Sequence, residues 1–305
     1  MRVWTHDRHR FPLPAGHRFP IGKYTLLRER VEATGVEICE SRPVPWGWLN
    51  AVHDPALVAR IQTGALTQRE ERAIGLPWSP GLVDRARRSV GGTVEAVRYA
   101  LEHGVGMNLG GGTHHAGRAF SRGYCLFNDV VVALSRMRAE RGVRRALVVD
   151  CDVHQGDGTA DLLGPDPEAF TLSLHGARNY PFQRIPSDLD VDIASGTGDE
   201  RYLQALAEAL DHAVPLARAE IAFYLAGADA WQGDRLGRLA LTKEGLLARD
   251  ELVLDRLRGE GIAVCVVLAG GYAEDVRDAV DINAATVAAV TRRCWPERQM
   301  PMKMR

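Results

Sequence analysis

Four apolar runs in this 305-residue chain each lead into residue types that bind metals or transfer protons. The runs at 106–109, 146–149, 221–226 and 263–268 lead into polar clusters at 110–115, 150–154, 227–229 and 270–272. Such runs are typical of buried parallel strands. Because parallel strands end at one edge of a sheet, where ligands bind, the pattern predicts an α/β fold with its active site at that edge.

Strands and helices are predicted to alternate along most of the chain. We expect strands at 2–5, 106–109, 146–150, 170–174, 221–226 and 263–268. Helical periodicity predicts helices at 21–34, 55–64, 80–102, 127–141, 199–217, 243–259 and 273–293. The proline- and tryptophan-rich segment 43–50 is interpreted as a loop. We expect one domain over residues 1–296 and a loose tail at 297–305.

Composition excludes several classes of partner. The formal net charge of −1 offers no global attraction for nucleic acid or an anionic membrane, so neither is expected as a partner. No apolar stretch free of charges reaches membrane-spanning length, and the first residues do not resemble a signal peptide. The five cysteines lack the close spacing of a zinc knuckle or redox motif, which favours a reducing, cytoplasmic setting. Nothing in the sequence indicates an oligomeric state.

One polar cluster has the ligand types of a metal site. Asp152 and His154 are two residues apart, so an extended chain points both side chains the same way. Asp229, after a later strand, supplies a second carboxylate. One histidine and two aspartates leave a coordination position open, as a catalytic zinc needs. Iron(II) would fit the same ligands.

Two other interpretations of these acids are weaker. A lone Asp-x-Asp motif usually caps a helix or stabilises a loop, but that interpretation would have to explain the acids, histidines and tyrosine at successive strand ends. A dinuclear manganese hydrolase would need another aspartate two residues after His154, where Gly156 stands. The sequence therefore favours a single metal.

Acid–base groups are predicted beside the metal. His114 and His115 follow three glycines, and two imidazoles near a metal suggest proton transfer to and from a bound water. Asp150 and Asp157 are the candidates to orient them. Tyr272, at another strand end, could donate a hydrogen bond to a developing oxyanion.

Six segments together resemble the zinc-dependent histone deacetylase family of the arginase/deacetylase fold. They are GGGTHHAG (110–117), GYCLFNDV (123–130), VVDCDVHQGDGT (148–159), TLSLH (171–175), AGADAWQGDRLGRLALT (226–242) and LAGGY (268–272). The short length and the segments 17–29 and 233–237 are most similar to the class IV branch and its bacterial relatives. The resemblance implies a three-layer α/β/α sandwich with a mainly parallel eight-stranded sheet.

The resemblance also implies a role for each residue of the site. Zinc would be bound by Asp152, His154 and Asp229. The acid–base pair would be His114 and His115, hydrogen-bonded to Asp150 and Asp157 respectively, with Tyr272 polarising the amide carbonyl. A monovalent cation, K⁺ or Na⁺, would lie near Asp150, Asp152, His154, Ser173 and Leu174. The acyl-lysine tunnel would be lined by Gly123, Tyr124, Tyr180 and Leu236.

The predicted reaction is the zinc-dependent hydrolysis of an N-acyl-lysine, either acetylated or carrying a longer chain. An acetylpolyamine or another small acylated amine is the alternative substrate, and a non-catalytic acyl-lysine binder is a further alternative. Many members of the family carry an acid on the rim that grips the substrate backbone. The segment 76–80 has none, so we expect the grip on the substrate backbone to be weaker or to be made differently here.

Overall fold

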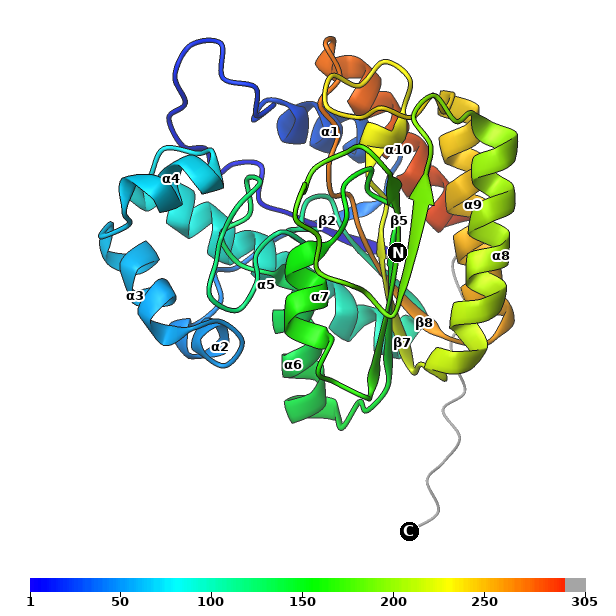
Figure 1. Ribbon diagram of the computed structural model, residues 1–305, viewed down its shortest axis with the longest axis horizontal. Helices are drawn as coiled ribbons and strands as arrows, with labels where there is room; N and C mark the ends of the chain where they lie inside the picture. The colour runs from blue at the N-terminus through cyan, green and yellow to red at the C-terminus, as the bar shows by residue number, and fades with distance from the viewer. Residues whose placement is uncertain (294–305) are drawn as a thin grey trace.

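Eight parallel strands form one sheet through the middle of the molecule (Figure 1). The structure, a computed structural model, describes residues 1–293. The sheet order is β2-β1-β3-β8-β7-β4-β5-β6, and every pairing is parallel. The strands are β1 (Arg2–Thr5), β2 (Glu37–Glu40), β3 (Val105–Asn108), β4 (Ala146–Asp150), β5 (Ala169–Gly176), β6 (Leu189–Ile193), β7 (Ile221–Leu225) and β8 (Ala263–Val267). The predicted eight-stranded sheet is confirmed.

Helices cover both faces of the sheet. One layer contains α1 (Lys23–Glu32), α8 (Asp199–Ala217), α9 (Lys243–Gly259) and α10 (Val276–Arg292). The other contains α2 (Trp46–Asn50), α3 (Pro55–Thr63), α4 (Gln68–Ile74), α5 (Pro80–His103), α6 (Asp129–Arg141) and α7 (Asp157–Leu163). Figure 1 shows the two layers on opposite sides of the strands. The predicted α/β/α sandwich is therefore confirmed.

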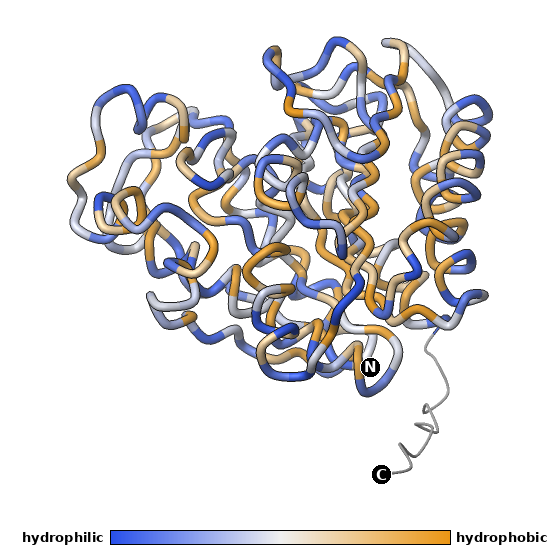
Figure 2. The backbone as a smooth tube through the Cα atoms, turned by 60° about the horizontal axis from the view of Figure 1, so that its bottom comes forward, coloured by the Kyte–Doolittle hydropathy of each residue, from blue (hydrophilic) through white to orange (hydrophobic). Residues whose placement is uncertain are grey.

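Alternation along each strand separates two hydrophobic cores. In β4, Leu147 and Val149 pack with α8 and α9, whereas Ala146 and Val148 pack with α5 and α6. Successive side chains of a strand point to opposite faces, so a strand covered on both faces must be apolar throughout. Figure 2 shows this as a hydrophobic interior surrounded by helices that alternate between hydrophobic and hydrophilic residues.

Most of the predicted elements are present, and their ends are set by caps. Asn128 accepts a hydrogen bond from Val131 N and starts α6. Thr242 accepts from Gly245 N and starts α9, as its sequence position predicts. Gly142 ends α6 in the left-handed conformation that favours glycine.

The prediction of a loop at 43–50 was wrong, because α2 begins after Pro45. Pro45 has extended backbone angles, so it can precede a helix even though proline disrupts a helix interior. The elements β2, α4, α7 and β6 were not predicted. The tail expected at 297–305 lies outside the described residues. Among residues 1–293, no helix combines the length and apolar character needed to cross a membrane.

Candidate active site

The four central strands bring the polar clusters together. β3, β8, β7 and β4 are neighbours in the sheet, although the chain visits them in a different order. Each continues at its carboxyl end into one of the clusters predicted to carry chemistry. All four clusters therefore lie at the same edge of the sheet, as expected for parallel strands.

Asp152, His154 and Asp229 form a compact group of buried ligands. One ligand atom from each of the three lies within 4.8 Å of the others. His154 Nδ1 is 2.9 Å from Asp152 Oδ1 and 3.3 Å from Asp229 Oδ2. The Val153 N–H donates to Asp229 Oδ1 over 3.0 Å, which fixes that carboxylate against the loop after β4. Asp229 Oδ2 is buried without a hydrogen-bond donor.

The charges of this group suit a bound cation. Burial and the neighbouring Asp152 raise the pKa of Asp229 to about 7. Burial acts to lower the pKa of His154, but its hydrogen bond to Asp152 and the nearby carboxylate of Asp229 raise it to about 10. Two carboxylates held together away from water favour positive charge between them. One imidazole and two carboxylates are also a donor set that zinc accepts, so the residues fit a divalent metal.

Gly270 has no side chain because the carboxylates leave no room for one. A Cβ at this position would lie 1.9 Å from Asp229 Oδ2 and 2.6 Å from Asp152 Oδ2. The Gly270 N–H donates to Asp152 Oδ2 over 2.8 Å. The backbone of this glycine thus approaches the ligand group closely and holds one ligand by a hydrogen bond.

His114 is paired with Asp150. Its Nδ1 lies 2.6 Å from Asp150 Oδ2, and its Nε2 lies 3.8 Å from Asp152 Oδ1. Burial acts to lower the pKa of His114, but the two carboxylates raise it to about 9. The imidazole of His114 is therefore held in its charged form near neutral pH.

His115 has the opposite electrostatic setting. Burial and the neighbouring His114 lower the pKa of His115 to about 4, against a hydrogen bond from its Nδ1 to Asp157. Asp157 is shared, because Arg122 Nε also donates to its Oδ2 over 2.6 Å. The positive charge of Arg122 offsets part of the negative charge on Asp157, which would otherwise stabilise protonated His115. A neutral imidazole can accept a proton, so His115 suits a base.

Tyr272 projects from the loop after β8, and this loop is tied to the segment 233–237. Asp234 accepts hydrogen bonds from the N–H groups of Tyr272, Leu236 and Gly237, at 2.5, 2.8 and 2.9 Å. Burial raises the pKa of Tyr272 well above its usual value, so the phenol keeps its proton. Tyr272, the predicted oxyanion donor, thus carries a protonated phenol on a loop that hydrogen bonds hold in place.

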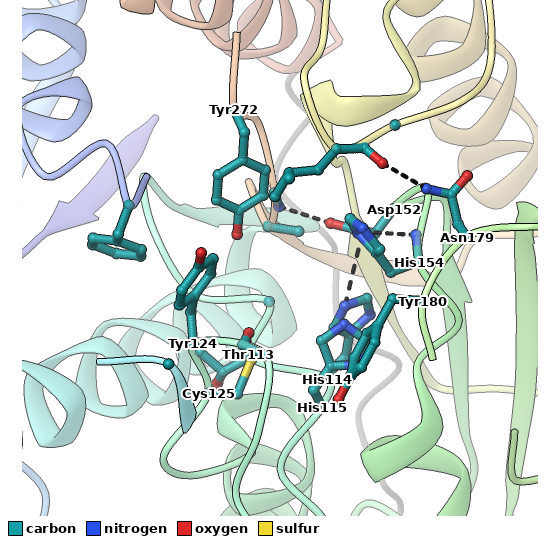
Figure 3. Close-up of a pocket in the computed structure, with 18 of the residues that line it drawn as sticks. Thr113, His114, His115, Tyr124, Cys125, Asp152, His154, Asn179, Tyr180 and Tyr272 are labelled. Atoms are coloured by element: carbon teal, nitrogen blue, oxygen red, sulfur yellow. Dashed lines mark hydrogen bonds and ion pairs between the residues drawn. The ribbon is translucent and has the colours of Figure 1, made fainter. Parts of the chain in front are cut away.

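A cavity of about 600 Å³ connects these groups to solvent. Figure 3 shows Tyr124 and Tyr272 on one side of it, with His114, His115, Tyr180, Asp152 and His154 on the other. The four residues predicted to form the tunnel all line this cavity, namely Gly123, Tyr124, Tyr180 and Leu236. The Tyr180 ring meets the His115 ring edge-on, with centroids 5.0 Å apart. The cavity therefore leads directly to the candidate base.

Of the residues predicted to surround a monovalent cation, Asp152 and His154 line the cavity. Asp150 pairs with Ser173 across β4 and β5, and Leu174 follows on β5. The Asp152 N–H donates to Asp150 Oδ1 over 3.1 Å. Ser173 Oγ lies 2.9 Å from His175 Nδ1.

The sequence did not reveal several charged residues around the site. Arg122 is one, and the fully buried Arg249 is another. The cavity is also lined by Arg18, Arg178, Arg235 and Arg238. Arg122 and Arg249 form no recognisable short motif with Asp157 and Gly227, because these partners are 35 and 22 residues away in the sequence.

Comparison with known proteins gives consistent matches. The family model described as histone deacetylase domain matches residues 17–289. An uncharacterised protein of Picosynechococcus sp. is 41% identical over 279 residues, which cover 90% of this chain and 93% of that protein. Histone deacetylase 2 of Arabidopsis thaliana is 35% identical over 189 residues, covering 61% of this chain and 49% of that protein.

A solved structure has the same fold. A histone deacetylase homologue crystallised in complex with SAHA superposes with a TM-score of 0.81 and 23% sequence identity. The superposition covers 96% of this chain and 83% of the other. At this level of identity the likeness concerns the fold.

Proposed function

Because this chain belongs to the histone deacetylase family and is a hydrolase, we propose that it hydrolyses the N-acyl amide of an acyl-lysine side chain. One observation carries the proposal. A single cavity is lined by two of the candidate metal ligands, Asp152 and His154, and by His115 and Tyr272. Metal ligands, a base and an oxyanion donor are what the hydrolysis of an unactivated amide requires.

Asp152, His154 and Asp229 would hold one zinc ion, or iron(II) in its place. When bound, such an ion polarises a carbonyl oxygen and lowers the pKa of a coordinated water. We also propose that K⁺ or Na⁺ is held beneath it by Asp150, Ser173 and the other residues named above. Both ions would offset the negative charge of the buried aspartates.

His115 would act as the general base. Because its Nδ1 is bonded to Asp157, its Nε2 is free to accept the proton of the attacking water and later to give it to the departing amine. Protonated His114 would add positive charge near the reacting carbonyl. The Tyr272 hydroxyl would donate a hydrogen bond to the oxygen that becomes negative during attack.

The cavity would hold the lysine stem and exclude water. Tyr124 and Tyr180 present aromatic rings to the cavity, and Gly123 lets the backbone come close to His115. The amine side of the substrate would remain at the mouth. We place this activity in a reducing, cytoplasmic setting, with which the four free cysteines within residues 1–293 are consistent.

An acyl-chain series tests this proposal and identifies the acyl group. Zinc-loaded protein is offered peptides with the same neutral flanks and an acetyl-, octanoyl- or myristoyl-lysine, together with a small acetylated amine. We expect turnover of at least one acyl-lysine peptide, and no turnover by the variant Asp229→Asn. Absence of turnover with every acyl-lysine peptide would overturn the proposal. Turnover of the small amine alone would favour the alternative substrate class.

A further inference from the structure

Four arginines surround the mouth of the catalytic cavity. They are Arg18, Arg178, Arg235 and Arg238, and all four are exposed. The single acidic residue that lines the cavity within residues 1–293 is Asp152, a buried member of the ligand group. The entrance therefore carries positive charge on a chain whose formal net charge is −1.

These guanidinium groups have no carboxylate partner in the described part of the chain. Other exposed arginines do form such pairs, as in Arg2 with Glu37 at 2.8 Å and Arg144 with Glu168 at 2.8 Å. No ion pair within 4.0 Å involves any of the four arginines at the mouth among residues 1–293. Their charge is thus directed to solvent and to whatever enters the cavity.

The loops that carry three of these arginines are joined to one another. Asn179 Nδ2 donates to Leu236 O over 2.8 Å and so connects the loop of Arg178 to the loop of Arg235 and Arg238. Arg235 Nε donates to Tyr272 O over 3.1 Å, which connects that loop to the candidate oxyanion donor. The arginines consequently have a fixed relation to the reacting end of the cavity.

The loop of Arg18 is attached to the other side of the mouth. His17 Nε2 lies 3.0 Å from Gly75 O, and the His17 and Tyr124 rings meet edge-on with centroids 6.1 Å apart. Burial raises the pKa of Tyr124, and the positive charges of Arg18 and Arg235 oppose that rise. The two arginines are therefore close enough to the tunnel wall to affect a group within it.

An exposed apolar side chain lies beside the arginines. Phe182 is 86% exposed and lines the same cavity. Its ring meets the Tyr180 ring edge-on, with centroids 6.3 Å apart. A peptide at the mouth could therefore gain apolar contact from Phe182 and charge contact from the neighbouring Arg178.

We propose that this enzyme selects acyl-lysines that lie in acidic peptide segments, with the arginines at the mouth binding the flanking carboxylates. The inference rests on the proposed function. Arginine suits this task because its planar guanidinium forms paired hydrogen bonds with a carboxylate. Unpaired charges of one sign around a cleft also raise the local concentration of oppositely charged substrate.

The position of the arginines determines which part of the substrate they contact. The ligand group and both histidines are buried at the inner end of the cavity, whereas the arginines are exposed at the outer end. The acyl group enters first, so the outer end meets the amine side and its neighbours. The same charges would repel a polyamine or a lysine-rich tail.

Three matched acetyl-lysine peptides test the inference, with acidic, neutral or basic flanking residues. Hydrolysis of the neutral peptide depends only on the proposed function, and the ratio of the charged peptides tests the selection. We expect kcat/KM for the acidic peptide to exceed that for the basic peptide by about tenfold or more at low salt. The difference should arise from a lower KM for the acidic peptide. The ratio should shrink as added salt screens the charges. Acetylspermidine should be hydrolysed poorly.

Charge-reversal variants locate the effect. Arg178→Glu combined with Arg238→Glu should reverse the preference, because both side chains lie at the mouth. The matched control is Arg144→Glu combined with Arg218→Glu, an equal change in charge just before β4 and β7, at the opposite edge of the sheet. The control should keep the wild-type preference.

Binding of the same peptides, labelled with a fluorophore, gives a second measurement that needs no turnover. Tighter binding of the acidic peptide supports the inference even if no peptide is hydrolysed, in which case only the proposed function fails. Equal or better binding and turnover of the basic peptide or of acetylspermidine would overturn the inference. An unchanged preference in the variant at the mouth would do the same.

Discussion

Replacing His115 with alanine is expected to lower kcat by about 10²–10⁴-fold, the usual contribution of a positioned general base. His115 is the neutral imidazole of the pair, since burial and His114 lower its pKa to about 4. The other histidines that line the cavity within residues 1–293 are His114, which pairs with Asp150, and His154, a candidate metal ligand. Metal binding should persist, because the three candidate ligands are untouched.

The measurement is steady-state turnover of an acyl-lysine peptide together with the metal content of each variant. His212→Ala, the same change at an exposed position of α8, serves as the control and should behave as wild type. Arg122→Met should give a smaller loss in kcat of about 10- to 100-fold, typical for removal of a group that orients a functional side chain. Full activity of His115→Ala with metal retained would contradict the role of His115.

The second large effect concerns Arg249, a fully buried guanidinium that contacts the loops after β4 and β7, here called the ligand loops. Its Nη1 donates to Gly227 O over 2.6 Å and to Cys151 O over 3.3 Å. Its Nε and Nη2 donate to Asp250 Oδ1 over 3.0 and 2.8 Å. Asp152 directly follows Cys151, and Asp229 follows Gly227 by two residues. Arg249 therefore holds together the backbones that present two ligands.

Arg249→Met is expected to lower the free energy of unfolding by about 3–5 kcal/mol, since Asp250 would stay buried without its cation. Tyr224 and Thr286 would still donate to Asp250 at 2.5 and 2.6 Å, but neither supplies charge. Metal affinity should fall as well, because the ligand loops lose their common support.

Denaturant unfolding measures the effect. Arg256→Met, on the same helix, is the matched control, because Arg256 pairs with the largely exposed Asp211. Exposed pairs contribute at most about 1 kcal/mol. If Arg249→Met lost no more stability than Arg256→Met, the buried network would not have the supporting role assigned to it.

The central strands could be predicted because burial on both faces makes them apolar throughout. The edge strands β2 and β6 could not be predicted in this way. β2 has Glu37 and Glu40 at its ends, and β6 alternates with Asp190 and Asp192, because one side of an edge strand meets solvent. The missed helix α4 did carry a signal, since Thr67 and Glu70 form a capping box.

The candidate site also contains residues that could be predicted from the sequence and residues that could not. The ligands and the two histidines occur in short segments whose residue types indicate metal and proton chemistry. Their convergence depends on the order β3-β8-β7-β4, which differs from the chain order and cannot be obtained from spacing. Arg122 and Arg249 act on partners 35 and 22 residues away, so no local pattern announces them.

Activity as a function of bound metal tests the central claim most directly. Protein stripped by a chelator receives increasing amounts of zinc, and hydrolysis of an acyl-lysine peptide is followed alongside the metal content. With Asp152, His154 and Asp229 as the ligand group, we expect activity to rise in proportion to zinc and to level off at one ion per chain. Full activity in the stripped protein, or activity that appears only with two ions per chain, would contradict the account.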